Sequence, residues 1–319
     1  ATGAPTGMVI TDGLLRSSDA GLCAVGFRSD GTAFIGKPQL TVTASFSGHT
    51  LLVGGVNKVR TIAGNYTLFS DDFSPSTQNT QPGVDVILTP VLDNLGQTVE
   101  VLIPDNTAST ALISDSPDGL SEPEPGDDNP SADDPGGHDP DPGDLAAPPA
   151  SETPGSAATT RTAVQSDQLR VGGRVTCTVD AVLQSTGAVD IPDGKFVISI
   201  NNQSNAWLRS ELAALQPGDT VHLDITSPDA RWNEAQYAVG GMYKLVTDGV
   251  VESGLPSEQV ARSAVGIRAD GTTIFYTIDG RQNGHSVGAS LTQVGQRSVW
   301  TAAAPPPWAP HCPTVTPCR

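Results

Sequence analysis

The feature that most constrains this chain is an acidic segment, rich in Pro and Gly, near its middle. From Asp115 to Glu152 the sequence holds twelve Asp and Glu residues and no Lys or Arg. Residues 114–160 contain no Val, Phe, Tyr or Trp. Such a segment cannot bury enough apolar surface to offset the entropy lost when a chain becomes ordered. We therefore predict a disordered acidic linker over residues 114–160, with the folded parts on either side of it.

The acidic segment also limits the partners of the chain. Calcium binding is one alternative role for an Asp-rich run, but the Asp-x-Asp-x-Asp-Gly order with a closing Glu is absent. Most of the formal net charge of −18 lies in this segment. An acidic balance argues against a nucleic-acid partner, which needs a basic face to meet phosphate, and against adhesion to an anionic membrane.

Targeting signals are also missing from the sequence as it stands. No apolar run is long enough for a transmembrane segment, and no signal peptide is present. The chain begins at Ala1 and not at Met. We interpret this start as a cut end, so the lack of a signal leaves the location open.

Both flanking parts consist mainly of short β-branched runs between turn signals. Examples from residues 1–113 are LTVTASF, TLLVGGV and VDVILTPVL, and examples from residues 161–297 are RVTCTVDAVL, KFVISI and TTIFYTI. These runs predict an α+β fold with a strand-rich mixed sheet and few helices.

Helical spacing is rare along the chain. Leu208, Leu212 and Leu215 share one helical face in the segment SNAWLRSELAAL (204–215), and Pro217-Gly218 then stops the helix. A second helix is expected to start over residues 290–296, with Ser290 as its N-cap.

The two parts echo each other. The segments ITDG (10–13) and AVGFRSDGT (24–32) return as VTDG (246–249) and AVGIRADGT (264–272). Asp-Gly pairs are hairpin signals that recur in any β-rich protein. The run of identities favours a true repeat, which implies one domain with two similar halves in one sheet system. Residues 1–113 and 161–297 would then be the N-terminal and C-terminal parts of that domain.

The strongest chemical motif follows an apolar strand, TTIFYTI. The strand ends in Asp279-Gly280-Arg281-Gln282, and strand alternation would put Asp279 and Arg281 on the same side of the pleat. Such a pair can hold an anionic substrate while the carboxylate handles a proton. The alternative is an ordinary surface hairpin with a weak salt bridge.

Other polar residues accompany glycines or strand ends. Arg262 is a second candidate anion contact, and Asn57 and Arg60 form a third polar cluster in GGVNKVR. His285 is either a general acid or base or a hydrogen-bonded turn residue. The four cysteines form no CxxC and no zinc spacing, so no metal site is expected; they are Cys23, Cys177, Cys312 and Cys318.

Taken in order, these motifs resemble the phosphodiester glycosidase family. The resemblance rests on ARSAVGI (261–267), DGRQ (279–282) and SVG (286–288), with GVNKVR (55–60) and LQPGDTV (215–221) upstream. It implies a mixed α+β domain that cleaves a sugar-1-phosphodiester and releases the sugar from a phosphate-bearing partner. It requires no cofactor, although a calcium ion stays an alternative, and it implies a cell-wall or exopolysaccharide glycan substrate and an extracellular or cell-envelope location.

The resemblance also implies roles for residues. Asp279 and Arg281 would be catalytic, with Asp279 as the acid–base or substrate-orienting carboxylate. The residues that it implies for substrate binding are Arg262, Asn57, Arg60, Gln282, His285 and Ser286. A non-catalytic glycan-binding module on the same fold and a purely structural β-rich domain are the alternatives. Convergence of the polar residues on one pocket would favour the enzyme.

The chain departs from the family after the second predicted helix. There the family carries a Leu-Asp-Gly-Gly-Gly-Ser motif, preceded by helix residues that we expect to be absent here. This chain reads Val299-Trp300 and then TAAAPPPWA, and a Pro-Pro-Pro run has no place in a central strand. Back-translation of residues 299–309, read two bases later, forces an Asp and allows Leu-Asp-Gly-Gly-Gly-Ser-Thr-Thr-Leu-Gly. We therefore predict that residues 298–319 are an out-of-frame tail that replaces this motif. A genuine Pro-rich tail is the alternative.

Overall fold

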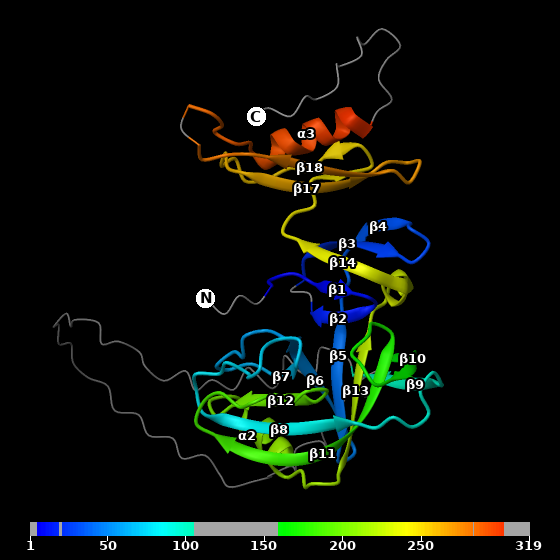
Figure 1. The fold of residues 1–319 in the computed structure, drawn as a ribbon, viewed down its shortest axis with the longest axis vertical. Helices are drawn as coiled ribbons and strands as arrows, with labels where there is room; N and C mark the ends of the chain where they lie inside the picture. Colours follow the sequence, from blue (N-terminus) through cyan, green and yellow to red (C-terminus); the bar gives the residue numbers. More distant parts are fainter. Residues whose placement is uncertain (1–4, 19–20, 105–158, 283, 303–319) are drawn as a thin grey trace, which may run out of the picture.

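The computed structural model describes residues 5–18, 21–104, 159–282 and 284–302. Figure 1 shows its elements in three layers along the long axis of the molecule. The lower layer is a barrel with helix α2, the middle layer is a five-stranded sheet, and the upper layer holds two hairpins and helix α3. The predicted strand-rich α+β class is confirmed.

Seven strands of the lower layer close into a barrel. Hydrogen-bonded neighbours run β13-β5-β6-β7-β12-β8-β11, and β11 pairs back with β13. The strands are β5 (Thr41–Phe46), β6 (His49–Val56), β7 (Tyr66–Ser70), β8 (Gly83–Pro90), β11 (Gly173–Ser185), β12 (Phe196–Asn201) and β13 (Thr220–Thr226). Alternation along β8 sends Val84, Val86 and Leu88 into the main core. Barrel closure leaves these strands without a free edge.

The predicted helix of residues 204–215 is present as α2 (Ala206–Ala213). The Asn205 side chain accepts hydrogen bonds from the Trp207 and Leu208 amides, which satisfies donors of the first turn. Leu212 and Leu215 are buried in the core that the barrel strands share, as their spacing predicts. Tyr66 donates to the Leu208 carbonyl at 2.8 Å and ties the helix to β7.

Strands β9 (Thr98–Ile103) and β10 (Thr159–Ser166) extend the sheet beyond β11. Ile103 pairs with Thr159, so the chain leaves and re-enters the same sheet on either side of residues 105–158. Most of the predicted linker lies outside the described residues. Its last two residues do not: Thr159 and Thr160 belong to β10, where pairing with β9 satisfies their backbone and corrects the predicted boundary.

The middle layer is a sheet of order β2-β1-β14-β3-β4. Its strands are β1 (Val9–Thr11), β2 (Leu14–Ser17), β3 (Cys23–Arg28), β4 (Ala33–Gly36) and β14 (Ala235–Gly241), and a 3-10 turn η1 (Ala230–Glu234) precedes β14. The fully buried Trp232 of η1 packs edge-on against Phe34, with ring centroids 4.6 Å apart. The central strand β14 pairs with both β1 and β3, so it joins the two N-terminal hairpins.

The upper layer consists of the hairpins β15 (Val246–Thr247)–β16 (Val250–Val251) and β17 (Arg262–Ile267)–β18 (Thr273–Ile278), with α3 (Leu291–Ala302) packed on them. The predicted N-cap is confirmed. Ser290 Oγ accepts from the Gln293 amide at 3.2 Å, and Gln293 Oε1 accepts from the Ser290 amide at 2.9 Å. This reciprocal pair is a capping box.

Helix α3 is longer than the sequence predicts. It runs to Ala302, so the predicted start of the tail at residue 298 falls inside the helix. That residues 298–319 are out of frame stays a prediction. Residues 303–319, with most of the predicted tail, Cys312 and Cys318, lie outside the described residues.

The internal echo is confirmed for the hairpins but not for a single sheet. Asp12 and Asp248 both have positive φ in their Asp-Gly turns, and turns 28–32 and 268–272 share the same hydrogen bonds. The N-terminal hairpins lie in the five-stranded sheet, whereas the C-terminal ones form two separate two-stranded sheets. The predicted single sheet system is therefore wrong.

The two described cysteines, Cys23 and Cys177, are free thiols. Cys177 lies in the barrel core, and burial raises the pKa of its thiol to about 12.

Candidate functional site

The loop after β18 folds back against the segment that precedes β17. A Cβ added at Gly280 would lie 2.3 Å from the Ala261 nitrogen, and one at Gly288 would lie 2.3 Å from the Val260 carbonyl carbon. Val260 also forms an antiparallel bridge with Ala289. Only glycine fits such close backbone approaches. The glycines of the DGRQ and SVG motifs therefore fix loop 279–288 beside the start of β17.

Arg262 begins β17 and points its guanidinium into this loop system. Its Nη2 donates to the Glu258 carbonyl at 3.0 Å, and its Nε donates to the Ala289 carbonyl at 3.4 Å. Arg281 pairs with the Glu258 carboxylate at 3.2 Å, and the two side chains are 73% and 68% exposed. Glu258 thus connects two predicted anion contacts. Glu258 is not predicted from the sequence, because nothing in its local pattern separates it from other surface carboxylates.

The predicted pairing of Asp279 with Arg281 on one side of the pleat is not what the structure shows. β18 ends at Ile278, and Arg281 has a φ of 59°. Strand alternation therefore ends before both residues, and Arg281 turns to Glu258 instead. Asp279 is exposed, and its carbonyl accepts from Ser286 Oγ at 2.6 Å.

Gln282, His285 and Ser286 belong to the same loop. The Gln282 amide donates to the Ser286 carbonyl at 2.9 Å, and the His285 amide donates to the Gln282 carbonyl at 3.1 Å. The Gln282 and His285 side chains are exposed. The structure therefore brings six predicted residues into one loop system: Arg262, Asp279, Arg281, Gln282, His285 and Ser286.

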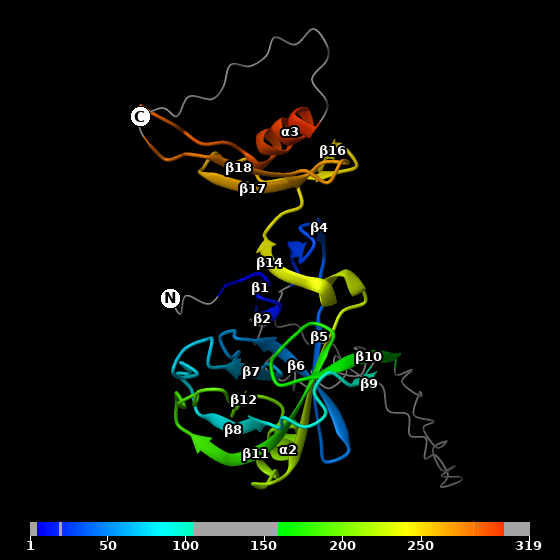
Figure 2. The same ribbon diagram turned by 45° about the vertical axis from the view of Figure 1, so that its right-hand side comes forward.

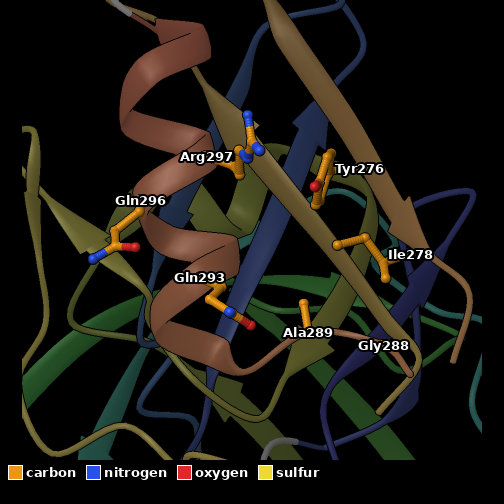
Figure 3. A pocket seen from close by; sticks show the side chains of 7 residues that line it. All are labelled: Tyr276, Ile278, Gly288, Ala289, Gln293, Gln296 and Arg297. Carbon is orange, nitrogen blue, oxygen red and sulfur yellow. The ribbon is translucent and has the colours of Figure 1, made fainter. Parts of the chain in front are cut away.

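A pocket of about 610 Å³ adjoins this loop, between α3 and β18. It is lined by Tyr276, Ile278, Gly288, Ala289, Gln293, Gln296 and Arg297. Figure 3 shows Arg297 and Gln293 on the helix and Tyr276 on the strand around it. These residues are not among those predicted from the sequence, although 293, 296 and 297 have the i, i+3, i+4 spacing of one helix face, which is a signal that could identify them.

Asn57 and Arg60 lie elsewhere, in the barrel layer. Asn57 is buried, donates to the Arg16 carbonyl and Ser70 Oγ, and accepts from the Ser70 amide. Arg60 is 7% exposed and donates to Ser199 Oγ at 2.9 Å. The predicted convergence of these two residues with Arg262 and Arg281 on one pocket is therefore not observed, since their hydrogen bonds serve the barrel, its loops and strand β2.

Arg60 belongs to a buried polar cluster on the barrel. It lies near Asp85, which is 0% exposed and accepts from Ser185. Burial raises the pKa of the Asp85 carboxyl and lowers the pKa of the Arg60 guanidinium, and each charge partly offsets the shift of the other. Asn79 donates to Ser199 Oγ at 3.0 Å and completes the cluster. This arrangement gives Arg60 a structural role that its sequence pattern does not distinguish from substrate binding.

Within the part of the chain that the structure describes, no group of three or more His, Cys, Asp and Glu side chains could hold a metal ion. Among the same residues, no helix has both the length and the apolar character needed to span a bilayer.

The loop that Gly280 and Gly288 fix carries Arg281, and Arg262 lies beside it. These two arginines form a candidate anion-binding site on a β-rich domain. A model of the phosphodiester glycosidase family matches residues 168–300, which include this whole site. The resemblance to this family that the motifs indicate is therefore confirmed over this part of the chain.

Two solved structures share the fold. A hypothetical protein from Synechocystis is 16% identical with a TM-score of 0.52, and the match covers 93% of this chain and 41% of that one. A Burkholderia pseudomallei protein described as exported is 14% identical with a TM-score of 0.52, and the match covers 94% of this chain and 54% of that one. The chain thus spans about half the length of these proteins or less. No curated protein matches the sequence.

Proposed function

We propose that this chain is a hydrolase of the phosphodiester glycosidase type that acts on sugar-1-phosphodiesters of cell-surface or exopolysaccharide glycans. The observation that carries the proposal is the family match over residues 168–300, which contains the loop that brings Arg262, Asp279 and Arg281 together. Water would cleave the bond between the anomeric carbon and the phosphate oxygen, giving a free sugar and a phosphomonoester.

The geometry supports a division of roles. The guanidinium groups of Arg262 and Arg281 suit a phosphate, because planar donors bind its oxygens in pairs. Asp279 is a carboxylate at the same edge and is available for proton transfer or for a sugar hydroxyl. Gln282, His285 and Ser286 would contact the sugar. Asn57 and Arg60 would act by holding the barrel, whose strands carry part of the same domain.

The substrate class suggests where the protein works. The proposed substrates are glycans of the cell surface or of exopolysaccharide, and the fold is shared with a protein described as exported. We therefore propose an extracellular or cell-envelope location.

A titration with an N-acetylglucosamine-1-phosphodiester tests the proposal on this chain, with ligand-observed NMR as the readout. Loss of one charge-assisted contact in Arg262→Ala should weaken binding about tenfold or more. Arg268→Ala is the matched control, because Arg268 lies just beyond the other end of β17. Equal binding by both variants would remove Arg262 from the site.

One observation favours a second candidate, a glycan-binding module without turnover. The residues that line the pocket between α3 and β18 include amides, a phenol and a guanidinium but no carboxylate. Binding of the N-acetylglucosamine-1-phosphodiester without release of sugar would favour this alternative.

A further inference from the structure

One face of the β17–β18 hairpin carries both a candidate anion contact and the pocket. In the hairpin register Arg262 pairs with Ile278, and Ala264 pairs with Tyr276. Paired residues of neighbouring strands point to the same face of a sheet, so Arg262, Ile278 and Tyr276 share a face. Ile278 and Tyr276 line the pocket between α3 and β18. Figure 2 shows α3 lying over this hairpin. The pocket is therefore on the same side of the hairpin as Arg262.

One end of the pocket lies at the anion contact. Arg262 Nε donates to the Ala289 carbonyl at 3.4 Å, and Ala289 lines the pocket. Gln293 lines the same end from the first turn of α3, where its side chain accepts a hydrogen bond from the Ser290 amide. A phosphodiester held by Arg262 would therefore have one of its two ester arms at this end of the pocket.

The other end of the pocket carries a second guanidinium. Arg297 is one helical turn beyond Gln293, about 6 Å along the axis of α3. Tyr276 is two residues from Ile278 on β18, about 6–7 Å along the strand. Figure 3 shows Arg297 and Tyr276 at one end of the pocket and Ala289 at the other. Because Ile278 is the strand partner of Arg262, these two donors lie roughly one sugar residue beyond the first anion contact.

The charge of the lining selects a class of ligand. Among the described residues that line the pocket, Arg297 is the only charged one, and none is Asp or Glu. A guanidinium stays protonated and binds the oxygens of a carboxylate or a phosphate through paired donors. The Tyr276 hydroxyl can donate to the same group. The arm of the substrate that enters the pocket should therefore carry an anionic group of its own.

We propose that this pocket is the subsite for the alcohol arm of the phosphodiester, and that it selects alcohols with an anionic group about one sugar residue from the bond that is cleaved. In the proposed function the sugar arm contacts Gln282, His285 and Ser286 on the loop, which leaves the pocket to the other arm. The inference rests on the proposed function for this assignment of arms, whereas the selection of an anionic group follows from the lining. Arg297 is thus a specificity-determining residue and not a catalytic one.

Two synthetic probes that differ only in charge test the proposal. Both are N-acetylglucosamine-1-phosphodiesters, one with 6-hydroxyhexanoate as its alcohol and the other with the neutral 6-hydroxyhexanamide. Calorimetric titration of the full chain should show the acid-ended probe bound about fivefold or more tightly, because it gains a charge-assisted contact. Equal affinities for the two probes would overturn the proposal.

A variant of Arg297 and a matched control locate the contact. Arg297→Gln keeps a good helix former in α3 and should abolish the preference for the acid-ended probe. Its affinity for the amide-ended probe should stay unchanged, which also shows that the site is folded. Arg209→Gln, on helix α2 of the barrel, should change neither affinity. A preference that survives Arg297→Gln would overturn the proposal.

The pocket and the proposed function can fail separately. A preference for the acid-ended probe that Arg297→Gln abolishes, without release of sugar from either probe, would keep the anion-selecting pocket and count against the proposed function. Release of sugar from both probes with equal affinities would keep the proposed function and overturn the selection of acidic alcohols.

Discussion

At the scale of the residue, burial separates arginines that look alike in the sequence. Arg60 is buried with Asp85, while Arg281 and its partner Glu258 are mostly in water. A buried charge that loses its partner is costly, whereas an exposed ion pair contributes little.

The first prediction follows from this contrast. Arg60→Ala should lower the free energy of unfolding by about 3–5 kcal/mol, because it removes the positive charge near the buried Asp85 carboxyl and one of the two donors to Ser199 Oγ. Arg281→Ala, the control, should change it by less than about 1 kcal/mol. Urea unfolding measures both, and similar losses in the two variants would contradict the structural role of Arg60.

A second prediction concerns Asp180 on β11. Hydrogen bonds from Lys195 at 2.5 Å and from Thr89 at 2.7 Å lower the pKa of its carboxyl below the ordinary 3.8. A carboxyl with a lowered pKa in the folded state stabilises the fold above 3.8, and this stabilisation is lost as the pH falls through the folded pKa. Asp180→Asn should therefore lower the free energy of unfolding at neutral pH, and the loss of stability below pH 3.8 should be less steep than in the unaltered chain. An acid unfolding curve equal to that of the unaltered chain would contradict this prediction.

Residue-level predictions succeeded where the cause is local. The Ser290 cap and the spacing of Leu212 and Leu215 follow from the neighbouring residues alone. The assignment of Asn57 and Arg60 to a pocket failed, because their partners Arg16, Ser70 and Ser199 are distant in sequence. A single sequence does not reveal which polar residues meet across a barrel.

At the scale of the element, glycines decide where the site loop lies. Gly280 has an ordinary φ but touches the Ala261 backbone, whereas Gly266, in the strand beside it, faces open space. Adding a Cβ at these two glycines is therefore the same chemical change in crowded and in open surroundings.

The third prediction uses this pair. Gly280→Ala should displace loop 279–288 and weaken binding of a sugar-1-phosphodiester, since its Cβ would meet backbone at 2.3 Å. Gly266→Ala should leave binding unchanged and be neutral or slightly stabilising, because it meets no neighbour and restricts the unfolded chain. Limited proteolysis of the loop together with the NMR titration checks both, and equal binding by the two variants would contradict the packing described.

The hairpins were predicted because Asp-Gly turns set them locally, whereas their grouping into sheets was not. The echo alone could not reveal that β14 joins only the first pair, since that pairing spans more than two hundred residues of the sequence. The end of α3 at Ala302 was not predicted either. Helix propensity depends on the residues that are present and not on the family motif that they replace.

At the scale of the whole molecule, the closed barrel and the open upper layer should differ in stability. Barrel strands are closed on themselves and carry most of the fully buried residues, while β15–β18 carry none. Regions with few buried contacts open locally at low free energy.

The fourth prediction is that native-state hydrogen exchange divides the chain accordingly. Amides of β8, β11 and β12 should exchange only on global unfolding, and those of β15–β18 should exchange through local opening that is nearly insensitive to low denaturant. A single cooperative unit with equal protection in both layers would contradict the division.

The central claim is the proposal that the loop beside β17 is a phosphodiester glycosidase site. The most direct measurement is release of sugar from an N-acetylglucosamine-1-phosphodiester by the chain. We predict release that Asp279→Ala lowers by about 10²–10⁴-fold and that Asp270→Ala, at the other end of the hairpin, leaves unchanged. Equal rates in the two variants, or no release by the unaltered chain, would contradict the claim.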